Sequence, residues 1–497
     1  MKTQDFLEHH GIRTNPFADE DAQTDPVFKE FCIASTHHPT WDKIYGDPAE
    51  PATSIVFGEK GSGKTALRLQ IARHLAEYNR AHSDQRVWVI EYDDFNPFLD
   101  RFRDRFGARH RRIDRVLSDF KLWDHMDAIL ALGVTGLVDR ILQSKHTDDP
   151  ATNELNGANL RALDRSQVRD LLVLAACYDQ SSSETSKGRW RRLRRKLRFR
   201  AWPTRWAFAL GFLGALAVAG LIIYQQTWTW LQTPWPYLIV AGLWTPWLLR
   251  SCNRLWRAMG VARNVRVGKH VANQLRQILM NFRSADIAGQ PLPRQQRTDD
   301  RYELLAKFQG ILKTLGFQGI IVLVDRVDEP HLINGSVEQM RALLWPMLDN
   351  KFLKHPGVGL KLLLPVELSQ YIDREDRDFY QRARLDKQNM IPSLDWTGEA
   401  LFDVASARLR ACATPGRQPQ LRDLFDESID ERRLVSAFRT LRVPRHLFKF
   451  MYRLFVAHCN AYTDDAPSWK ISPERFETVL ALYSRDQDAF DRGLRAG

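Results

Sequence analysis

The sequence predicts an α/β fold, in which a parallel sheet with helices on both faces is split by a helical insertion carrying two transmembrane helices. A helical C-terminal region follows. A short apolar run ending at Phe57 leads into a glycine-rich stretch and then into helical periodicity. A second apolar run, 320–324, does not alternate with polar residues, as expected of a strand covered on both faces. Between these runs, residues 206–249 contain no Asp, Glu, Lys, Arg or His.

The length and composition indicate a globular chain with several domains. The chain has 497 residues, of which 44% are hydrophobic and 27% charged, which excludes a disordered or fibrous protein. Its five cysteines form no CxxC pair, which argues against a disulfide framework or a cysteine zinc site. We expect an N-terminal lead-in and the first part of the sheet domain at 1–100, a helical insertion at 101–186, a basic-flanked hairpin at 187–270, the second part of the sheet domain at 271–400, and a helical C-terminal domain at 401–497.

The uncharged stretch is long enough to cross a membrane twice, because one helical crossing needs about 20 apolar residues. We expect spans at 206–224 and 237–249, the second of which is shorter and contains Pro246. Nine Lys/Arg at 187–200 and six at 250–269 flank the stretch without any acid, so both soluble parts are expected in the cytoplasm. A buried hairpin in a soluble protein is the alternative, and uncharged runs of this length make it the weaker one.

The net charge of +12 reflects these two flanks, because together they contain more basic residues than the chain's whole surplus of Lys and Arg over Asp and Glu. Beside a membrane span, such residues are expected to contact anionic lipid headgroups, at about 1 kcal/mol for each residue near the surface. The bilayer is therefore the predicted partner of the basic runs, and binding to nucleic acid is not indicated.

The glycine-rich stretch from Gly58 to Thr65 matches GxxxxGK[ST], the P-loop. In such a loop the backbone amides surround a phosphate, the lysine reaches the outer phosphates and the hydroxyl binds Mg²⁺. The motif lies between a strand and a helix, which disfavours an unrelated glycine-rich turn and predicts a P-loop NTPase sheet. No guanine-specificity motif is present, so ATP with Mg²⁺ is the expected cofactor. The predicted binding residues are Gly58, Gly61, Ser62, Gly63, Lys64 and Thr65.

Three acids follow the second apolar run, where a P-loop protein needs a carboxylate for its metal ion. Asp325 comes directly after Val324, and we expect it to hold Mg²⁺ together with Thr65. Glu329 is the preferred general base and Asp328 the supporting acid, although the sequence barely separates the two roles. An ordinary acidic loop would be the better interpretation if no P-loop were present.

These motifs resemble a known class of signalling ATPases. The sequence Asp325-Arg326-Val327-Asp328-Glu329 resembles the hhhhDxxDE Walker B element of STAND-type NTPases. The 260-residue separation between Thr65 and Asp325 contains the hairpin, an arrangement similar to that of the KAP family of membrane NTPases. The KAP element usually reads DDLDR, from which this chain departs at Arg326 and Glu329.

Two further segments resemble AAA-type and STAND proteins. Residues 11–18 are similar to the lead-in of secretion-associated AAA-type ATPases, where the segment packs near the base. Residues 443–447 resemble a Pro-Arg sensor helix, which implies that Arg445 reaches the outer phosphate; a solvated arginine is the equally weighted alternative. In a homo-oligomer Arg384 could serve as an arginine finger, although a solvated helix face is the more common role of such residues.

The sequence thus predicts a membrane-anchored cytoplasmic ATPase that acts as a nucleotide-dependent switch. The family resemblance suggests signalling or phage defence as its role. The alternative is a membrane scaffold that binds ATP with little hydrolysis and recruits an unknown protein partner. The presence of Glu329 favours turnover. A transport ATPase ranks lower, because the expected spans contain no charged residue.

Overall fold

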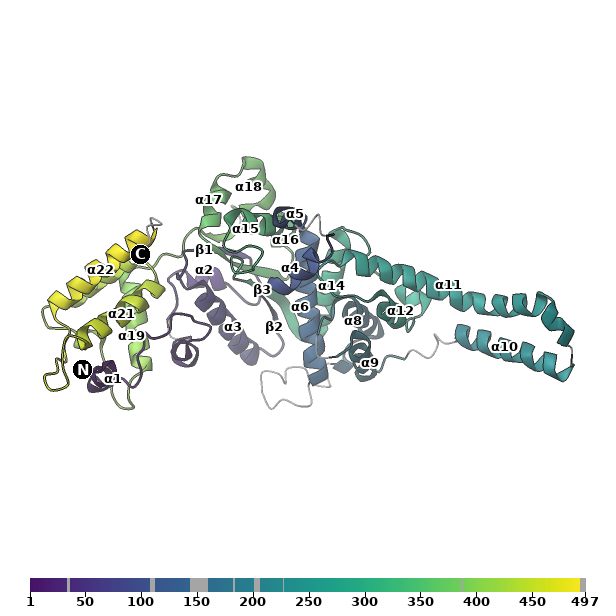
Figure 1. The fold of residues 1–497 in the computed structure, drawn as a ribbon, viewed down its shortest axis with the longest axis horizontal. Coiled ribbons are helices and arrows are strands. Elements are labelled where there is room, and N and C mark those ends of the chain that lie inside the picture. Colours follow the sequence, from purple (N-terminus) through teal and green to yellow (C-terminus); the bar gives the residue numbers. More distant parts are fainter. Residues whose placement is uncertain are drawn as a thin grey trace.

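The structure is a computed structural model of an elongated molecule (Figure 1). A helical C-terminal domain occupies one end, the sheet lies in the middle, and a long helical hairpin projects from the other end. The described residues are 1–33, 36–107, 112–143, 160–181, 184–200, 206–226, 228–385 and 388–491.

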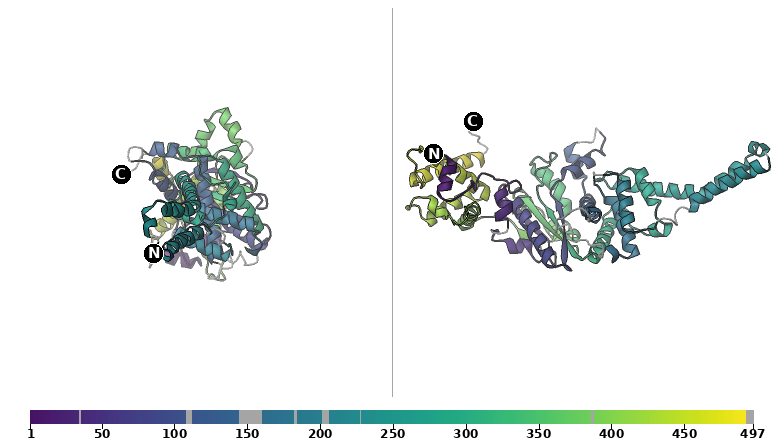
Figure 2. Two further views of the ribbon diagram at one scale, coloured as in Figure 1. Left: turned by 90° about the vertical axis from the view of Figure 1, so that its right-hand side faces the viewer. Right: turned by 90° about the horizontal axis from the view of Figure 1, so that it is seen from below.

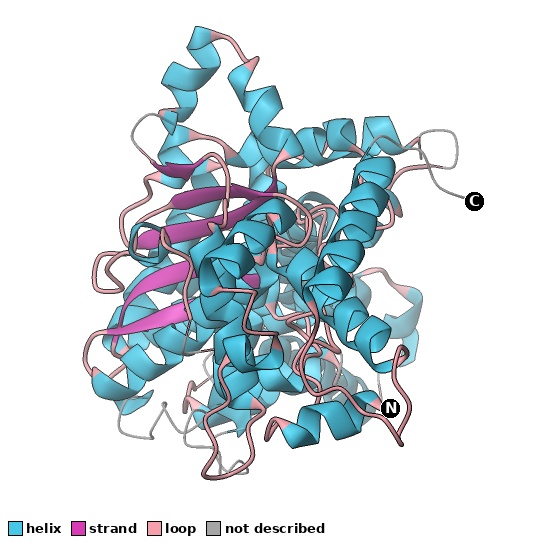
Figure 3. Ribbon diagram, turned by 90° about the vertical axis from the view of Figure 1, so that its left-hand side faces the viewer, coloured by secondary structure: helices cyan, strands magenta, loops and turns pink. Residues whose placement is uncertain are grey.

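The predicted parallel sheet is confirmed, and the described residues form five strands in the order β2-β3-β4-β1-β5. Figure 3 shows the strands, in magenta, lying side by side. All four pairings are parallel. The sequence predicts strands at its two apolar runs and also at 86–92 and 359–364. All four strands are present, whereas β5 is a short fifth strand that no apolar run predicts. The strands are β1 Ser54–Gly58, β2 Arg86–Tyr92, β3 Phe317–Val324, β4 Val358–Pro365 and β5 Asn389–Ile391.

One face of the sheet is covered by helix α3, Lys64–Ala81. Val56 of β1 and Leu363 of β4 point to this face and pack in one buried cluster with Leu67 and Ile71 of the helix. Their strand neighbours point to the opposite face because successive side chains in a strand alternate. Since both faces are buried, the strands are apolar at nearly every position, as the unalternating sequence predicts.

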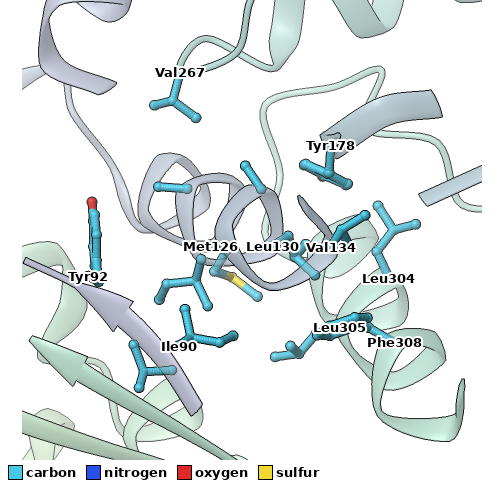
Figure 4. Close-up of a cluster of buried hydrophobic side chains, with 14 of the residues drawn as sticks. Ile90, Tyr92, Met126, Leu130, Val134, Tyr178, Val267, Leu304, Leu305 and Phe308 are labelled. Carbon is cyan, nitrogen blue, oxygen red and sulfur yellow. The ribbon is translucent and has the colours of Figure 1, made fainter. Parts of the chain in front are cut away.

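The opposite face is covered by α6, Leu122–Gln143, and α14, Asp299–Thr314. Figure 4 shows Ile90 of β2 facing Met126 of α6, with Leu305 and Phe308 of α14 close by. Helix α6 belongs to the predicted insertion, 101–186, and yet it completes the core of the sheet domain. Helix α8, Arg165–Tyr178, and α9, Ser186–Lys196, extend the same hydrophobic cluster toward the hairpin.

Shorter helices fill the loops around this core. They are α2 Trp41–Tyr45, α4 Asn96–Arg103, α5 Ile113–Ser118, α12 Ala272–Leu279, α13 Ser284–Ile287, α15 Val337–Leu344, α16 Asn350–Leu353, α17 Glu367–Asp373 and α18 Arg377–Ala383. Single turns of 3₁₀ or π type occur at Phe28–Cys32, Trp228–Gln232, Trp345–Met347 and Leu421–Leu424.

The hairpin consists of α10, Trp206–Tyr224, and α11, Trp235–Asn264. Helix α10 has the predicted bounds of the first span. It is the one helix among the described residues that is long and apolar enough to cross a membrane. The predicted second span, 237–249, lies in the first half of α11, but this helix continues into the basic flank and does not meet the same criterion. The structure therefore supports one candidate span where the sequence predicts two.

Small residues let the two hairpin helices approach each other closely. A Cβ atom on Gly211 would lie 2.9 Å from the Trp244 ring, and one on Gly214 would lie 2.4 Å from the Leu243 side chain. The Phe208 ring meets the Trp244 ring edge-on at 5.5 Å. Glycine contacts of this kind are typical of helices that pair within a bilayer. The large apolar side chains on the outer surface remain exposed, among them Leu213 and Ile223.

The C-terminal domain contains α19 Gly398–Ala411, α20 Glu431–Leu441, α21 Pro444–Cys459 and α22 Pro473–Asp491. Its hydrophobic core also includes Phe6, Leu7, Ile12 and Phe17 from the N-terminal segment, whose first helix is α1, Thr3–His9. Figure 2 shows the N-terminus within this domain. The sequence predicts the N-terminal lead-in together with the first part of the sheet domain. Its aromatic side chains are instead buried against α21 of the C-terminal domain.

Candidate nucleotide-binding site

The P-loop connects β1 to α3 and bends through two left-handed glycines. Gly61 has a φ of +91° and Gly63 a φ of +94°, a region that favours glycine strongly over other residues. Gly63 caps α3, so the helix begins at Lys64 with its amides directed toward the loop. The Lys64 Nζ atom donates hydrogen bonds to the carbonyl oxygens of Gly58 at 2.8 Å and Glu59 at 3.0 Å. The lysine thus closes the loop over a cradle of backbone groups.

Burial lowers the pKa of the Lys64 ammonium, and the carboxylates of Asp328, Asp325 and Glu367 oppose this shift. These acids follow β3 and β4, whereas the lysine follows β1. They converge because parallel strands end at the same edge of the sheet. The edge of the sheet thus combines a lysine, which suits phosphate, with carboxylates, which suit a metal ion.

Asp325 lies at the end of β3, and β4 separates that strand from β1. The Asp325 side chain is buried, and burial raises its pKa, while a hydrogen bond from the Thr65 hydroxyl and the charge of Arg68 lower it. The two residues predicted to hold Mg²⁺ are therefore in direct contact.

Two buried oxygen atoms at this point have no hydrogen-bond partner among the described residues, namely Ser62 Oγ and Asp325 Oδ2. The nearest cation to Asp325 Oδ2 is Arg68 Nε, at 3.5 Å. Buried polar groups are normally paired, so these two atoms indicate where a ligand contributes the missing contacts.

Asp328 and Glu329 both line the same pocket as the P-loop. The Glu329 side chain is 56% exposed, and its Oε2 atom lies 3.5 Å from an Arg326 guanidinium nitrogen. Burial raises the pKa of Glu329, Asp328 adds to the rise, and Arg326 opposes it. The structure brings both candidate acids to the site.

Arg445 lies against the P-loop. It is the second residue of α21, and its backbone amide donates a hydrogen bond to the Gly61 carbonyl at 3.3 Å. A Cβ atom on Gly61 would lie 2.7 Å from the Arg445 side chain, so glycine is required here for space as well as for conformation. The side chain lines the pocket and is 32% exposed. The geometry thus places Arg445 beside the loop, and its contact with an outer phosphate stays a prediction.

Arg384 does not line this pocket in its own chain. It follows α18 with a φ of +46° and is exposed in a shallow surface depression with Asp376 and Asp378. The cluster of arginines and acids around α18 is a solvated surface in the single chain.

Sequence reasoning missed two residues of the site. Arg68 is buried and contacts Glu91 at 2.5 Å and Asp93 at 2.8 Å as well as Asp325. Its position one helical turn after Lys64 is the signal that could have found it. Trp396 donates a hydrogen bond from Nε1 to the Ser62 carbonyl at 2.8 Å, and no sequence signal identifies it because β5, which brings it there, is so short.

The pocket continues past the P-loop between the sheet domain and the C-terminal domain. Phe28 from the N-terminal segment and Phe448 of α21 contribute apolar surface. Arg408 of α19 and Asp25 form a buried ion pair at 2.5 Å, and the Arg408 guanidinium lies 4.3 Å from the centre of the Phe448 ring. This side of the pocket combines flat apolar surface with a few polar groups, as small-molecule sites commonly do.

These residues fit ATP with Mg²⁺. Lys64 and the loop amides would hold the phosphates, and Thr65 with Asp325 would hold the cation. No group of three or more His, Cys, Asp or Glu side chains placed to bind a metal ion occurs in the described part of the chain. An Mg²⁺ ion that uses one hydroxyl, one carboxylate, phosphate oxygens and water needs no such group.

Comparisons with known proteins add no family assignment. No protein-family model matches this chain, and no curated protein or solved structure gives a significant match. The site's geometry is therefore the basis for the functional argument.

Proposed function

We propose that this protein is a membrane-anchored P-loop ATPase that acts as a nucleotide-dependent switch. The observation that supports this most directly is that Lys64 and Thr65 converge on Asp325. At the same point Ser62 Oγ and Asp325 Oδ2 are buried without a hydrogen-bond partner among the described residues. A glycine-rich turn without a ligand would have no reason to bury a carboxylate beside a helix N-terminus.

Each residue has a role that follows from its position. Lys64 and the amides at the start of α3 stabilise negative charge on the phosphates. Thr65 and Asp325 bind Mg²⁺, which would supply charge neutralisation at the transferring phosphate when bound. Glu329 or Asp328 accepts the proton of the attacking water. Arg445 links the loop to the C-terminal domain, so that domain is positioned to respond to the outer phosphate.

ATP binding and hydrolysis by the detergent-extracted full-length protein test the proposal, with wild type beside Lys64→Ala. We expect measurable ATP binding that the substitution abolishes, and turnover that falls with it. Lys60→Ala, on the same loop but outside the motif's required positions, is the matched control and should retain binding. Equal ATP affinity in wild type and Lys64→Ala would contradict the proposal.

The alternative, an ATP-binding scaffold with little hydrolysis, is favoured by one observation. Glu329 is paired with Arg326 and turned toward solvent instead of being buried near the phosphates. Glu329→Gln separates the two functions. Turnover that falls by about 100-fold with binding retained supports the ATPase, whereas unchanged background turnover supports the scaffold and its unknown protein partner.

We further propose that α10 and the first half of α11 cross the bilayer, with both soluble parts in the cytoplasm. Cys252 lies just past this half and is the exposed cysteine among the five, the other four being buried. In sealed vesicles, a membrane-impermeant maleimide should label Cys252 only when the cytoplasmic face is outward. Cys252→Ser provides the background, and equal labelling in both orientations would contradict the topology.

A homo-oligomer is the arrangement in which Arg384 could reach a neighbouring site. Mixing Lys64→Ala chains with Arg384→Ala chains tests this, because each assembly then contains sites with an intact loop and an intact finger. Partial recovery of turnover on mixing supports a finger in trans, and no recovery argues against it. Signalling or phage defence stays a proposal by family analogy, to be tested by infecting cells that express wild type or Lys64→Ala.

A further inference from the structure

A pocket with an unusual charge lies at the root of the hairpin. The hairpin leaves the sheet domain on the side away from the C-terminal domain (Figure 1). Its apolar part comes from Trp206 and Ala207 at the start of α10 and from Pro246 and Leu249 in α11. Its polar part is dominated by guanidinium groups from α11 and from the residue before α13. These are Arg250, Arg254, Arg257 and Arg283.

Three of these four arginines are not paired with an acid among the described residues. Within the described part of the chain, Arg254, Arg257 and Arg283 form no ion pair with a carboxylate. Arg254 is 3% exposed and donates to the Arg283 carbonyl at 3.4 Å, and Arg257 donates to the Ile287 carbonyl at 3.4 Å. Asp286 is the one acid that acts on Arg254 electrostatically.

A buried cation without a paired anion is costly unless a ligand compensates it. Burial, together with the charges of Arg257 and Arg250, lowers the pKa of Arg254 to about 10. The guanidinium is therefore still charged at neutral pH. Several guanidinium groups around one space are well suited to phosphate, because each presents paired donors to its oxygen atoms.

The location of the pocket indicates the source of that phosphate. It lies where the exposed apolar surface of the hairpin begins. Trp206, which lines the pocket, is 59% exposed, and Trp256 on the basic half of α11 is 68% exposed. Exposed tryptophans at the end of an apolar helix mark the headgroup region of a bilayer, and basic pockets at this depth suit lipid headgroups.

We propose that this pocket is a specific site for an anionic phospholipid, whose phosphate binds Arg254, Arg257 and Arg283 while its acyl chains lie along α10 and the first half of α11. This rests on the membrane part of the proposed function and not on the nucleotide site. It differs from the diffuse attraction expected of α9, because the arginines here line one pocket.

Native mass spectrometry of the full-length protein in neutral detergent tests the site. Detergent removes the surface potential of the bilayer, so diffuse attraction no longer retains lipid. With added phosphatidylglycerol we expect one retained lipid per chain, retained at least about tenfold more than phosphatidylcholine. Arg254→Gln and Arg257→Gln should each reduce retention by about tenfold or more.

The matched control is Arg195→Gln, an exposed arginine of the basic helix α9 that does not line the pocket. It should retain phosphatidylglycerol like wild type. Arg257 is less buried than Arg254, so Arg257→Gln keeps the test informative if Arg254→Gln fails to fold, which a thermal melt of each variant would reveal.

Three results would overturn the proposal. They are equal retention of phosphatidylglycerol and phosphatidylcholine, loss of lipid equally in Arg195→Gln, and displacement of the lipid by inorganic phosphate at equal concentration, which would make it a free-anion site. ATP binding measured on the same samples separates this outcome from failure of the nucleotide site, and extraction of the protein without detergent would instead reveal failure of the membrane anchor.

Discussion

At the scale of single residues, the P-loop is held by contacts from distant parts of the chain. Trp396, which follows β5, donates a hydrogen bond to the Ser62 carbonyl, and Arg445, the second residue of α21, donates one to the Gly61 carbonyl. Both hydrogen bonds are accepted by backbone carbonyl groups of the loop, so they fix its shape without occupying the candidate phosphate site. The loop's conformation is therefore coupled to the C-terminal domain.

Trp396→Phe tests this support. Removing the indole N–H leaves the Ser62 carbonyl without its donor, which costs about 1 kcal/mol, so ATP affinity should fall by about fivefold. Isothermal titration of ATP measures the change. Trp345→Phe is the matched control, because the Trp345 indole donates to Glu375 away from the site. Equal losses in both variants would mean that the effect is on general stability.

The acid dependence of turnover reports on Glu329. The base must be ionised, so the rate falls as the pH drops through its pKa, which burial raises above the ordinary value of about 4.3. Arg326 opposes that rise. Arg326→Gln should therefore move the acid limb of the kcat profile to higher pH, whereas Arg326→Lys should leave it nearly in place. If neither substitution moves the limb, Glu329 is not the base and Asp328 becomes the candidate.

At the scale of elements, buried ion pairs connect the hairpin to the sheet domain. Arg301 of α14 and Asp127 of α6 form a pair at 3.0 Å with both side chains fully buried, and Arg301 also donates to the Asn264 carbonyl at the end of α11. Arg266, just past that helix, contacts Asp124 of α6 at 2.5 Å. The root of the hairpin is thus fixed to the same helix that covers β2.

Asp127→Asn should destabilise the protein by about 3–5 kcal/mol, because it leaves the buried charge of Arg301 without its partner. Thermal unfolding in detergent measures the loss. The double variant Asp127→Leu with Arg301→Met should recover much of it, since both charges are then absent. Arg73→Gln, which breaks the exposed Arg73–Glu77 pair on α3, should cost no more than about 0.5 kcal/mol. A loss as small in Asp127→Asn would contradict this account.

At the scale of the whole molecule, the candidate nucleotide site and the hairpin lie at opposite ends of the sheet domain (Figure 1). The site is closed by the C-terminal domain, whose core includes the first residues of the chain. The candidate nucleotide site and the apolar hairpin are therefore separated by the sheet and by α6. A signal between the candidate site and the hairpin would have to cross the sheet and α6.

Phe6→Ala tests the role of the N-terminal segment in the C-terminal domain. Phe6 is fully buried beside Phe455 and His458, so its removal should cost about 3–5 kcal/mol and weaken ATP binding through the displaced domain. Thermal unfolding and ATP titration measure both effects. Phe31→Ala, at a side chain that is 51% exposed, should change neither appreciably. Similar results for the two variants would mean that the segment is not part of that core.

Local patterns were sufficient for much of the fold. Apolar runs predicted β1 and β3, because strands buried on both faces have to be apolar throughout. Mostly apolar stretches with one or two charged residues predicted β2 and β4. The strand and helix on either side of the glycine-rich loop, the position of Asp325 at the end of β3 and the bounds of α10 followed from motif and length. The predicted second span, 237–249, is not a separate helix. It is the apolar half of α11, which continues into the basic half without a break.

By itself, the sequence determined the parallel sheet, the glycine-rich loop between β1 and α3 and the apolar helix α10, because each depends on residues that are neighbours in the chain. Only the tertiary structure decided the rest. Trp396, Arg68 and Arg445 surround the loop because strand order and domain packing bring them there. The N-terminal segment joins the C-terminal core for the same reason. Contacts between residues hundreds of positions apart leave no local periodicity, so packing alone reveals them.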